Sequence, residues 1–379
     1  MSTRDTPPAV LHVVDTLDVG GLERVVTDLA IAQQAAGQSV AVFAINECGG
    51  FRSELEAAGV PVVVGAKCGT LDRRVLRLLR ATMRERRVAV VHTHNFVPNY
   101  YAALATLALR DAPVLVNTVH NMGTRLAHRR LRWLYLASLR RTRRVAMVGR
   151  QVHERFVGLG LVDEARAVTV MNAVPAERFG VDAARRAEAR ARLGIAADAP
   201  LLGCVGRLVE LKNHRLLIEQ MPELLRAQPQ LRLVVLGDGP LRGELQALVD
   251  ALGLADRVTL AGAHGDVHAL LPGFDVFVLP SRTEGLSIAL LEACASGLAV
   301  VASAVGGNPE IVRDGETGLL FASDDGAGLG AAVRRLLADP AERQRLGAAA
   351  RDWVLRNAST AALRDAYAGV YRAALDARR

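Results

Sequence analysis

Two glutamates, Glu284 and Glu292, lie eight residues apart in the stretch best suited to chemistry. The apolar run before them predicts a strand that ends at Ser281, and the pattern after them predicts a helix from about Leu286. Glu284 then lies in the loop and Glu292 two turns along the helix, where ionised carboxylates can accept strong hydrogen bonds from sugar hydroxyls. Gly285 lets a ligand approach the backbone, whose free N–H groups attract phosphate oxygens. Glutamates at this spacing are often merely solvated, but the strand–loop–helix context favours a ligand site.

Two cations, Arg207 and Lys212, follow the first strand predicted in the second half of the chain. Both can reach a diphosphate from a turn between a strand and a helix. Only Lys67 and Lys212 are lysines among 47 basic residues, so a compact ammonium at position 212 departs from the chain's habitual arginine. The alternative is a solvated pair at a helix start, and the position at a strand end favours phosphate binding.

Two other glycine-containing loops are candidates for ligand contacts. Gly20 and Gly21 follow the first predicted strand and precede a helix, which predicts a turn that a phosphate or a sugar can approach. The third glycine of the dinucleotide fingerprint is missing, and this disfavours NAD. Gly262 and His264 lie in a loop where a nucleotide base could rest on the backbone.

Histidines lie at the ends of two predicted strands. His120 is expected at the carboxyl end of its strand, which predicts a substrate contact, although a lone histidine is more often structural. His92 and His94 have the spacing of a metal-binding pair but no neighbouring carboxylate or cysteine, so we expect them to line the acceptor side without a metal. The sequence has no Asp-x-Asp motif, which argues against a diphosphate held through a divalent cation.

Short apolar runs rich in β-branched residues alternate with helical patterns along the whole chain. This alternation predicts right-handed βαβ units and mostly parallel sheets, an α/β fold. The first-half strands are predicted at residues 11–15, 39–45, 61–64, 88–92 and 114–120, and the second-half strands at 201–205, 231–236, 258–261, 276–279 and 298–302.

The alternation pauses near residue 172 and restarts at residue 201, which predicts two domains. We expect an N-terminal Rossmann-like domain over residues 1–175, a C-terminal one over residues 176–357, and a helical tail over residues 358–379. Two doubly wound parallel sheets place ligand sites at the carboxyl ends of their strands, so we expect the sheets to face a cleft that holds the substrates.

Composition narrows the class of protein further. The chain has 379 residues, 51% hydrophobic and 23% charged, as expected of a globular protein. Its four cysteines form no Cys-x-x-Cys pair, which argues against a zinc ribbon, and the first strand begins too early for a signal peptide. We therefore expect a cytoplasmic protein. Aromatic residues make up only 4%, so stacking platforms for single-stranded nucleic acid are not expected.

A net charge of +8 predicts affinity for an acidic partner. The densest basic segment runs from Arg125 to Arg150, contains Trp133 and Tyr135, and has no acidic residue. A basic helix with aromatic residues suits an anionic membrane surface. The alternative is a helix that packs its apolar side on the sheet and leaves its arginines in solvent, and the two weigh about equally.

These motifs together resemble glycosyltransferase family 4, a group of retaining enzymes with the two-domain GT-B architecture. The resemblance covers nearly the whole chain. It is carried by the Gly-Gly-Leu-Glu loop at Gly20, the Gly-Arg-Leu turn that leads to Lys212, the Gly-Asp-Gly-Pro turn at residues 237–240, and the glutamates 284 and 292.

The resemblance implies a role for each matching residue. Arg207 and Lys212 would bind the donor diphosphate, Glu292 the donor ribose, and Glu284 the transferred sugar near its reacting carbon. His120 would hydrogen-bond that sugar, and Gly20 with Gly21 would shape the junction with the acceptor. The backbone of the loop that follows Glu284, at Gly285, Leu286 and Ser287, would complete the donor site.

The implied activity is a retaining, metal-independent transfer from a UDP-sugar or GDP-sugar, with no separate cofactor. A glycan or a polyprenyl-diphosphate-linked sugar in cell-surface polysaccharide synthesis is the expected acceptor. Three alternatives remain open: a nucleotide-sugar epimerase of the same architecture, a dehydrogenase, and a basic nucleic-acid-binding module, for which the sequence contains no recognised binding motif.

Overall fold

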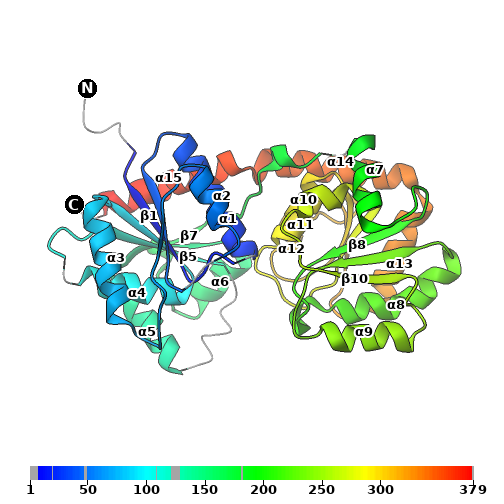
Figure 1. Ribbon diagram of the computed structural model, residues 1–379, viewed down its shortest axis with the longest axis horizontal. Coiled ribbons are helices and arrows are strands. Elements are labelled where there is room, and N and C mark those ends of the chain that lie inside the picture. Colours follow the sequence, from blue (N-terminus) through cyan, green and yellow to red (C-terminus); the bar gives the residue numbers. More distant parts are fainter. Residues whose placement is uncertain are drawn as a thin grey trace. The chain divides into compact units, whose positions relative to one another are not determined.

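The computed structural model describes residues 7–18, 20–46, 49–107, 109–120, 129–180 and 182–377. The chain forms two compact units, and both are α/β (Figure 1). The first unit contains Met1–Ala173 together with Thr360–Arg379, and the second contains Val174–Ser359. All pairings between named strands in the described residues are parallel, which confirms the fold class expected from the alternating pattern.

The first unit is built on a seven-stranded sheet in the order β3-β2-β1-β4-β5-β6-β7. Every residue of β1, β2, β4 and β5 is buried, because helices cover both faces of a parallel sheet. The strands are β1 (Val10–Val14), β2 (Val40–Ala44), β3 (Val62–Val64), β4 (Val90–His94), β5 (Val114–Val119), β6 (Thr142–Met147) and β7 (Ala167–Thr169).

Two expectations for this unit are wrong in detail. The strand predicted at residues 88–92 is β4, which begins and ends two residues later, so both His92 and His94 lie within it. The basic segment is not one helix, because helix α5 (Arg129–Leu139) ends before strand β6, and residues 121–128 lie outside the described part of the chain.

The helices of the first unit include one from the far end of the chain. Helix α15 (Thr360–Asp376) contacts α1, β5 and β6, and it buries Leu363, Tyr367, Val370 and Tyr371 at helical spacing (Figure 1). Besides α5, the other described helical segments of this unit are α1 (Gly21–Ala35), α2 (Arg52–Ala57), α3 (Arg73–Glu85), α4 (Phe96–Thr106), α6 (Arg150–Gly158) and η2 (Glu164–Arg166).

The second unit has a six-stranded sheet in the order β10-β9-β8-β11-β12-β13. Its strands are β8 (Leu201–Val205), β9 (Arg232–Leu236), β10 (Val258–Gly262), β11 (Val276–Leu279), β12 (Ala299–Ser303) and β13 (Leu319–Phe321). Its helical segments are η3 (Ala176–Arg178), α7 (Ala183–Leu193), η4 (Glu210–Lys212), α8 (His214–Ala227), α9 (Arg242–Ala251), α10 (Val267–Leu270), η5 (Leu271–Gly273), α11 (Ile288–Ala295), α12 (Asn308–Ile311), α13 (Gly326–Ala338) and α14 (Pro340–Asn357).

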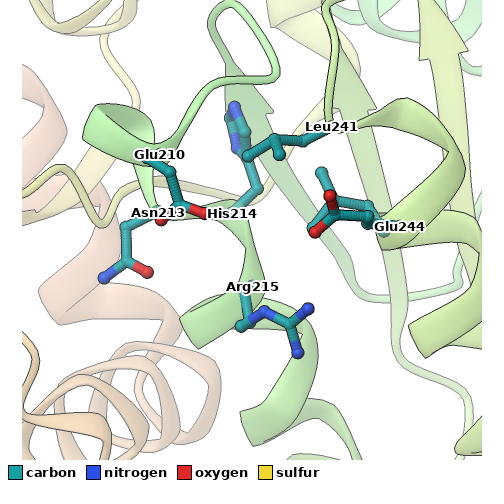
Figure 2. A pocket seen from close by; sticks show the side chains of 7 residues that line it. Glu210, Asn213, His214, Arg215, Leu241 and Glu244 are labelled. Atoms are coloured by element: carbon teal, nitrogen blue, oxygen red, sulfur yellow. The ribbon is translucent and has the colours of Figure 1, made fainter.

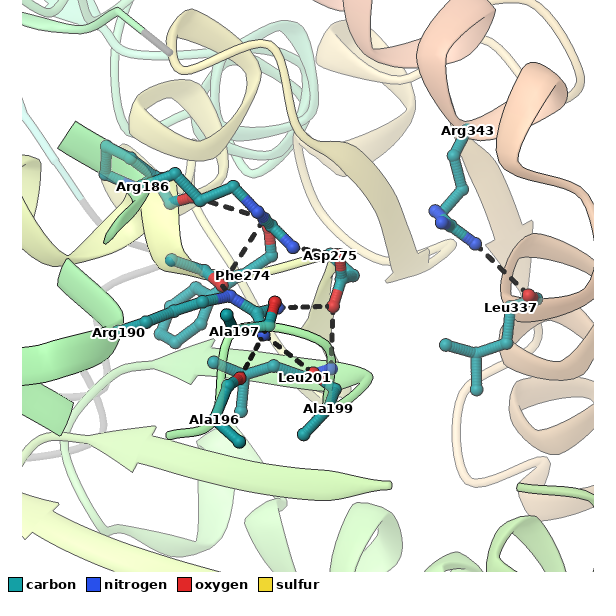
Figure 3. A network of polar contacts seen from close by, with 12 residues as sticks. Arg186, Arg190, Ala196, Ala197, Ala199, Leu201, Phe274, Asp275, Leu337 and Arg343 are labelled. Carbon is teal, nitrogen blue, oxygen red and sulfur yellow. Dashed lines mark hydrogen bonds and ion pairs between the residues drawn. The ribbon is translucent and has the colours of Figure 1, made fainter. Parts of the chain in front are cut away.

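Two arginines attach α7 to the amino end of the second sheet. Arg186 and Arg190 both point toward Asp275, which lies just before β11 and accepts a hydrogen bond from the backbone N–H of Leu201 at the start of β8 (Figure 3). Arg190 is buried, and its guanidinium also donates to four backbone carbonyls. These contacts satisfy a buried cation and fix the edge of the sheet opposite the carboxyl ends of its strands.

Candidate active site

The strand order of each unit reverses at one place, its topological switch point. In the second sheet this point lies between β8 and β11, and in the first between β1 and β4. Loops that follow the two strands at such a point diverge to opposite sides and leave room for a ligand at their carboxyl ends. Lys212 follows β8, Glu284 follows β11, and Gly20 follows β1, so all three lie in switch-point loops.

Lys212 and Glu284 are in direct contact. The Lys212 Nζ lies 2.6 Å from the Glu284 Oε1, and the Ser281 hydroxyl donates to the same oxygen at 2.6 Å. The Glu284 side chain is 8% exposed and the Lys212 side chain 23%. The cation and the hydroxyl compensate a mostly buried carboxylate, and both charges remain at the edge of the sheet where a ligand can reach them.

Arg207 lies in the same β8 loop but behaves differently. It is exposed, and its guanidinium forms no hydrogen bond or ion pair with any described residue. Its backbone is held instead: His214 Nε2 donates to the Arg207 carbonyl at 3.2 Å, and the Cys204 thiol lies 3.3 Å from His214 Nδ1. Burial lowers the pKa of His214 to about 4 and raises the pKa of Cys204 to about 12, so both are neutral supports of the loop.

Close approaches at two glycines join the loops of this edge in two pairs. Gly237, after β9, has φ +146°, and a Cβ there would overlap the Gly206 carbonyl oxygen. Gly306, after β12, has φ +56°, and a Cβ there would overlap the Glu284 carbonyl oxygen. A hydrogen bond from Gly307 N to Gly285 O at 2.7 Å joins the same two loops. Only glycine fits positions of this kind.

Polar contacts connect the η4 turn to the loop after β11. Arg282 binds Glu210 at 2.9 Å and Asp324 at 2.8 Å, and Asn213 donates to the same Asp324 oxygen at 3.0 Å. Behind the η4 turn is a small pocket with carboxylates at both ends (Figure 2). It is lined by Glu210, Asn213, His214, Arg215, Leu241, Glu244 and Leu245.

The predicted donor-site residues on α11 are placed as follows. The helix begins at Ile288 rather than near Leu286, because Ser287 is its N-cap and accepts from Leu290 N at 3.4 Å. Leu286 is buried, so its side chain packs inward. Glu292 is partly exposed in the second turn of the helix.

The remaining predicted residues lie at other loops. Gly262 ends β10 at φ +84°, and its carbonyl accepts from Gly237 N at 2.7 Å, while His264 is partly exposed beyond it. In the first unit Gly20 is the N-cap of α1, which begins at Gly21. The structure therefore brings Lys212 and Glu284 together, and it places the β10 loop two strands away from the β8 loop.

The first unit contains a histidine cluster that the sequence did not predict. His12 on β1 pairs in register with His92 on β4, and His94 lies on the same face two residues further. His12 Nδ1 lies 3.0 Å from His94 Nε2, and His94 Nδ1 lies 3.0 Å from His120 Nε2. Asn95, at φ 63°, accepts from the backbone N–H of His120 at 2.9 Å.

Burial keeps these four histidines neutral. It lowers the pKa of His12 to about 4 and that of His120 to about 3. The pKa values of His92 and His94 are well below the ordinary range, because of burial and then because of the neighbouring histidines. Placing a positive charge among them would require desolvating it without any anionic partner.

Three imidazoles of this cluster satisfy the distance criterion for a metal site. The ligand atoms of His12, His92 and His94 lie within 4.8 Å of one another. However, both nitrogens of each ring already have hydrogen-bond partners: Gln33, the neighbouring histidines, Tyr371 and Thr118. We therefore interpret the cluster as a hydrogen-bond network.

The fold, together with the side chains at the carboxyl ends of its strands, defines a class of protein. Solved structures with the GT-B fold of glycosyltransferases superimpose on the chain, among them Anabaena HepE in complex with UDP-glucose, at TM-score 0.83 and 20% identity over 95% of this chain and 98% of HepE. Two doubly wound parallel-sheet units are the components of that fold.

Sequence matches specify the family. Residues 19–178 match the model described as Glycosyltransferase Family 4, and residues 185–353 match Glycosyl transferases group 1. The chain is 30% identical to the lipopolysaccharide core biosynthesis glycosyltransferase LpsE of Rhizobium meliloti, over 92% of this chain and 94% of LpsE. The chain belongs to glycosyltransferase family 4.

A shorter match links the chain to a lipid-modifying relative. It is 37% identical to the GDP-mannose-dependent alpha-(1-6)-phosphatidylinositol monomannoside mannosyltransferase of Mycolicibacterium smegmatis over 224 residues. That alignment covers 56% of this chain and 58% of the relative, little more than half its length.

Proposed function

We propose that this glycosyltransferase moves a sugar from a nucleoside-diphosphate sugar to an acceptor hydroxyl, with retention of anomeric configuration and without a metal. The observation that carries the proposal is the contact of Lys212 with Glu284 at the switch point of the second sheet. An ammonium beside a carboxylate supplies, within one site, a partner for phosphate oxygens and a partner for sugar hydroxyls.

The donor is proposed to be a GDP-sugar or a UDP-sugar. The mannosyltransferase relative is named for GDP-mannose, and HepE was solved with UDP-glucose. Lys212 binds the diphosphate together with Arg207, whose guanidinium has no partner among the described residues. Gly285, Leu286, Ser287 and Glu292 hold the donor from the α11 side, and Gly262 with His264 supports the base.

The proposed reaction breaks the anomeric C–O bond, and the electron pair leaves with the diphosphate. Arg207 and Lys212 stabilise the charge that develops on the departing phosphate, which lowers the barrier by preorganised electrostatics. The acceptor oxygen forms the new bond on the same face, and its proton passes to the departing phosphate oxygen. Glu284 and His120 orient the transferred sugar.

The acceptor is proposed to be a lipid-linked or polysaccharide intermediate at the inner face of the cytoplasmic membrane. The names of LpsE and of the mannosyltransferase both refer to lipid-attached glycans. None of the helices in the described ranges is long and apolar enough to cross a membrane. Helix α5 offers a peripheral contact instead, because it exposes Arg129, Arg130, Arg132 and Trp133, the last at 69%.

The function is tested by assaying transfer and nucleotide release with GDP- and UDP-sugars in EDTA. We expect one nucleoside diphosphate to stabilise the wild type against heat, and Lys212→Ala to lose this stabilisation. Lys67→Ala, at the other lysine, is the matched control and should retain it. Anomeric proton NMR of the product reports retention. Conversion of the donor without an acceptor would show an epimerase, and activity that requires added Mg²⁺ would contradict the metal-free site.

The membrane contact is tested by flotation with vesicles that contain anionic phospholipid. We expect binding at low salt that weakens when Arg129, Arg130 and Arg132 are replaced by serine. The control removes the same charge from α3, at the exposed Arg73, Arg77 and Arg84. Equal loss in both triple variants would mean that only net charge matters, and it would refute a contact through α5.

A further inference from the structure

Four polar side chains form a continuous hydrogen-bonded row through the first unit, which we call the histidine row. Its members in order are Gln33, His12, His94 and His120. Gln33 Oε1 lies 2.7 Å from His12 Nε2, and each of the two histidine–histidine contacts measures 3.0 Å. Gln33, His12 and His94 are at most 2% exposed, so water cannot replace these partners.

A row of neutral imidazoles can carry its protons in only two self-consistent ways. A neutral imidazole has one N–H and one lone pair, so each ring donates on one side and accepts on the other. If His12 donates to Gln33, it must accept from His94, which in turn must accept from His120. If Gln33 donates to His12, all three directions reverse. The burial of the rings favours neutrality throughout the row.

Helix α15 binds the first residue of this row through Tyr371. The Gln33 Nε2 donates to the Tyr371 hydroxyl at 3.3 Å, which turns its carbonyl oxygen toward His12. The Tyr371 proton then faces His92 Nδ1 at 2.8 Å, and His92 donates from Nε2 to the Thr118 hydroxyl at 2.7 Å. Rotation of the Gln33 amide would satisfy this branch equally, with Tyr371 donating to Gln33 and His92 donating to Tyr371, so the branch fits both directions of the row.

The direction of the hydrogen bonds along the row decides whether His120 Nδ1 carries a proton or a lone pair. With Gln33 accepting, His120 donates from Nε2 to His94, and its Nδ1 carries a lone pair. The Nδ1 is buried and has no hydrogen-bond partner among the described residues. Unpaired buried acceptors are tolerated better than unpaired buried N–H groups, so this unpaired atom decides the direction, in which Gln33 accepts.

We propose that the histidine row, anchored by Tyr371, fixes His120 in the tautomer whose Nδ1 accepts, so that this atom binds a hydroxyl donor of the substrate sugar. The inference rests on the proposed function for the identity of the ligand, but the tautomer itself does not. Gln33, His12, His94 and Tyr371 are positioning residues. A sugar with a deoxy or O-methyl group facing Nδ1 has no proton to donate and binds poorly.

The tautomers are read directly by ¹⁵N NMR of protein labelled at histidine, with the His120 signals assigned from their loss in His120→Gln. We expect a protonated Nε2 and an unprotonated Nδ1 at His120, His94 and His12. A protonated Nδ1 at His120 overturns the proposal whether or not the enzyme transfers sugar, and so separates this inference from the function.

Two tyrosine variants on the same helix provide the matched comparison. Tyr371→Phe leaves the Gln33 amide N–H without an acceptor in the present arrangement, but only its carbonyl without a donor in the reversed one, so an Nδ1-protonated population should appear at His120. Tyr367→Phe removes the hydroxyl that pairs with Thr118 at 2.9 Å and leaves the row intact, so His120 should keep the wild-type spectrum. Tautomer populations that are the same in wild type and both variants would refute the role of α15.

Activity and metal addition complete the test. Loss of one hydrogen bond of about 1 kcal/mol predicts that Tyr371→Phe lowers kcat/KM about fivefold, with the deoxy donor affected less than the parent sugar. An equal loss on both donors would mean a general structural defect. Addition of Zn²⁺ alone should leave the histidine spectrum unchanged, and a shift of His12, His92 and His94 together would show a metal site and overturn the hydrogen-bonded row.

Discussion

Buried polar side chains of the two sheets have different kinds of hydrogen-bonding partner. Glu284 depends on one ammonium and one hydroxyl, since Lys212 and Ser281 both contact its Oε1. The clustered histidines of the first unit, His12, His92 and His94, depend only on neutral partners. A charge is therefore kept at the switch point of the second unit, where phosphate chemistry is proposed, and excluded from the histidine cluster of the first.

Removing the ammonium should leave Glu284 as a mostly buried, uncompensated carboxylate. We expect Lys212→Ala to lower the free energy of unfolding by about 1–3 kcal/mol, less than for a fully buried pair because Lys212 is partly exposed. The double variant Lys212→Ala with Glu284→Gln should recover most of this loss, since a neutral amide needs no cation. Thermal unfolding checks both, and a double variant less stable than Lys212→Ala would contradict the explanation.

The sequence predicted the loop residues better than it predicted their partners. Lys212 and Glu284 both lie where strand-end reasoning placed them, because a strand end is visible in a local pattern. Their direct contact joins residues 72 positions apart and depends on β8 and β11 being neighbours. His12 has no local signal, because it is a single polar residue in an apolar strand, and only the register with β4 brings it to His92.

At the scale of elements, short loops rather than helices shape the candidate site. The β9 and β8 loops touch through backbone at Gly237, and the β12 and β11 loops at Gly306, so the spacing within each pair is fixed without side chains. In the basic segment, residues 125–150, the local sequence pattern predicted the wrong element. The segment's arginines run into β6, whose apolar run is short, with Val145, Ala146 and Met147 buried in succession, and the basic pattern predicts a helix instead.

Gly306→Ala tests the contact between the β12 and β11 loops. Gly306 and Gly315 both have positive φ, but a Cβ at Gly315 would meet no atom within 4 Å. We expect Gly315→Ala to cost about 1 kcal/mol from backbone strain alone. Gly306→Ala should cost clearly more, because the added carbon displaces the Glu284 backbone. It should also weaken nucleotide binding.

Chemical denaturation measures both stabilities, and thermal shift with the preferred nucleotide measures binding. If the two alanine variants are equally stable and bind nucleotide equally, the overlap at Glu284 does not control the loop.

At the scale of the whole molecule, the two units differ in their buried titratable groups. In the described part of the chain, four histidines with lowered pKa values lie in the first unit: His12, His92, His94 and His120. In the second unit, one described histidine, His214, has a lowered pKa. The units share a fold class but should respond differently to acid.

Acid should therefore unfold the first unit before the second. A histidine whose pKa is lower in the folded state than the ordinary 6.5 binds its proton more readily when unfolded, so stability is complete above pH 6.5 and falls as the pH drops toward 4. At pH 5 each such histidine lowers the free energy of unfolding by about 2 kcal/mol, and most carboxylates are still ionised.

Hydrogen exchange at pH 7 and pH 5, corrected for intrinsic rates, should show protection lost in β1, β4 and β5 but kept in β8 and β11. Equal loss in both sheets would mean that the buried histidines do not set the acid limit, and earlier loss in the second would place that limit in its carboxylate pairs instead.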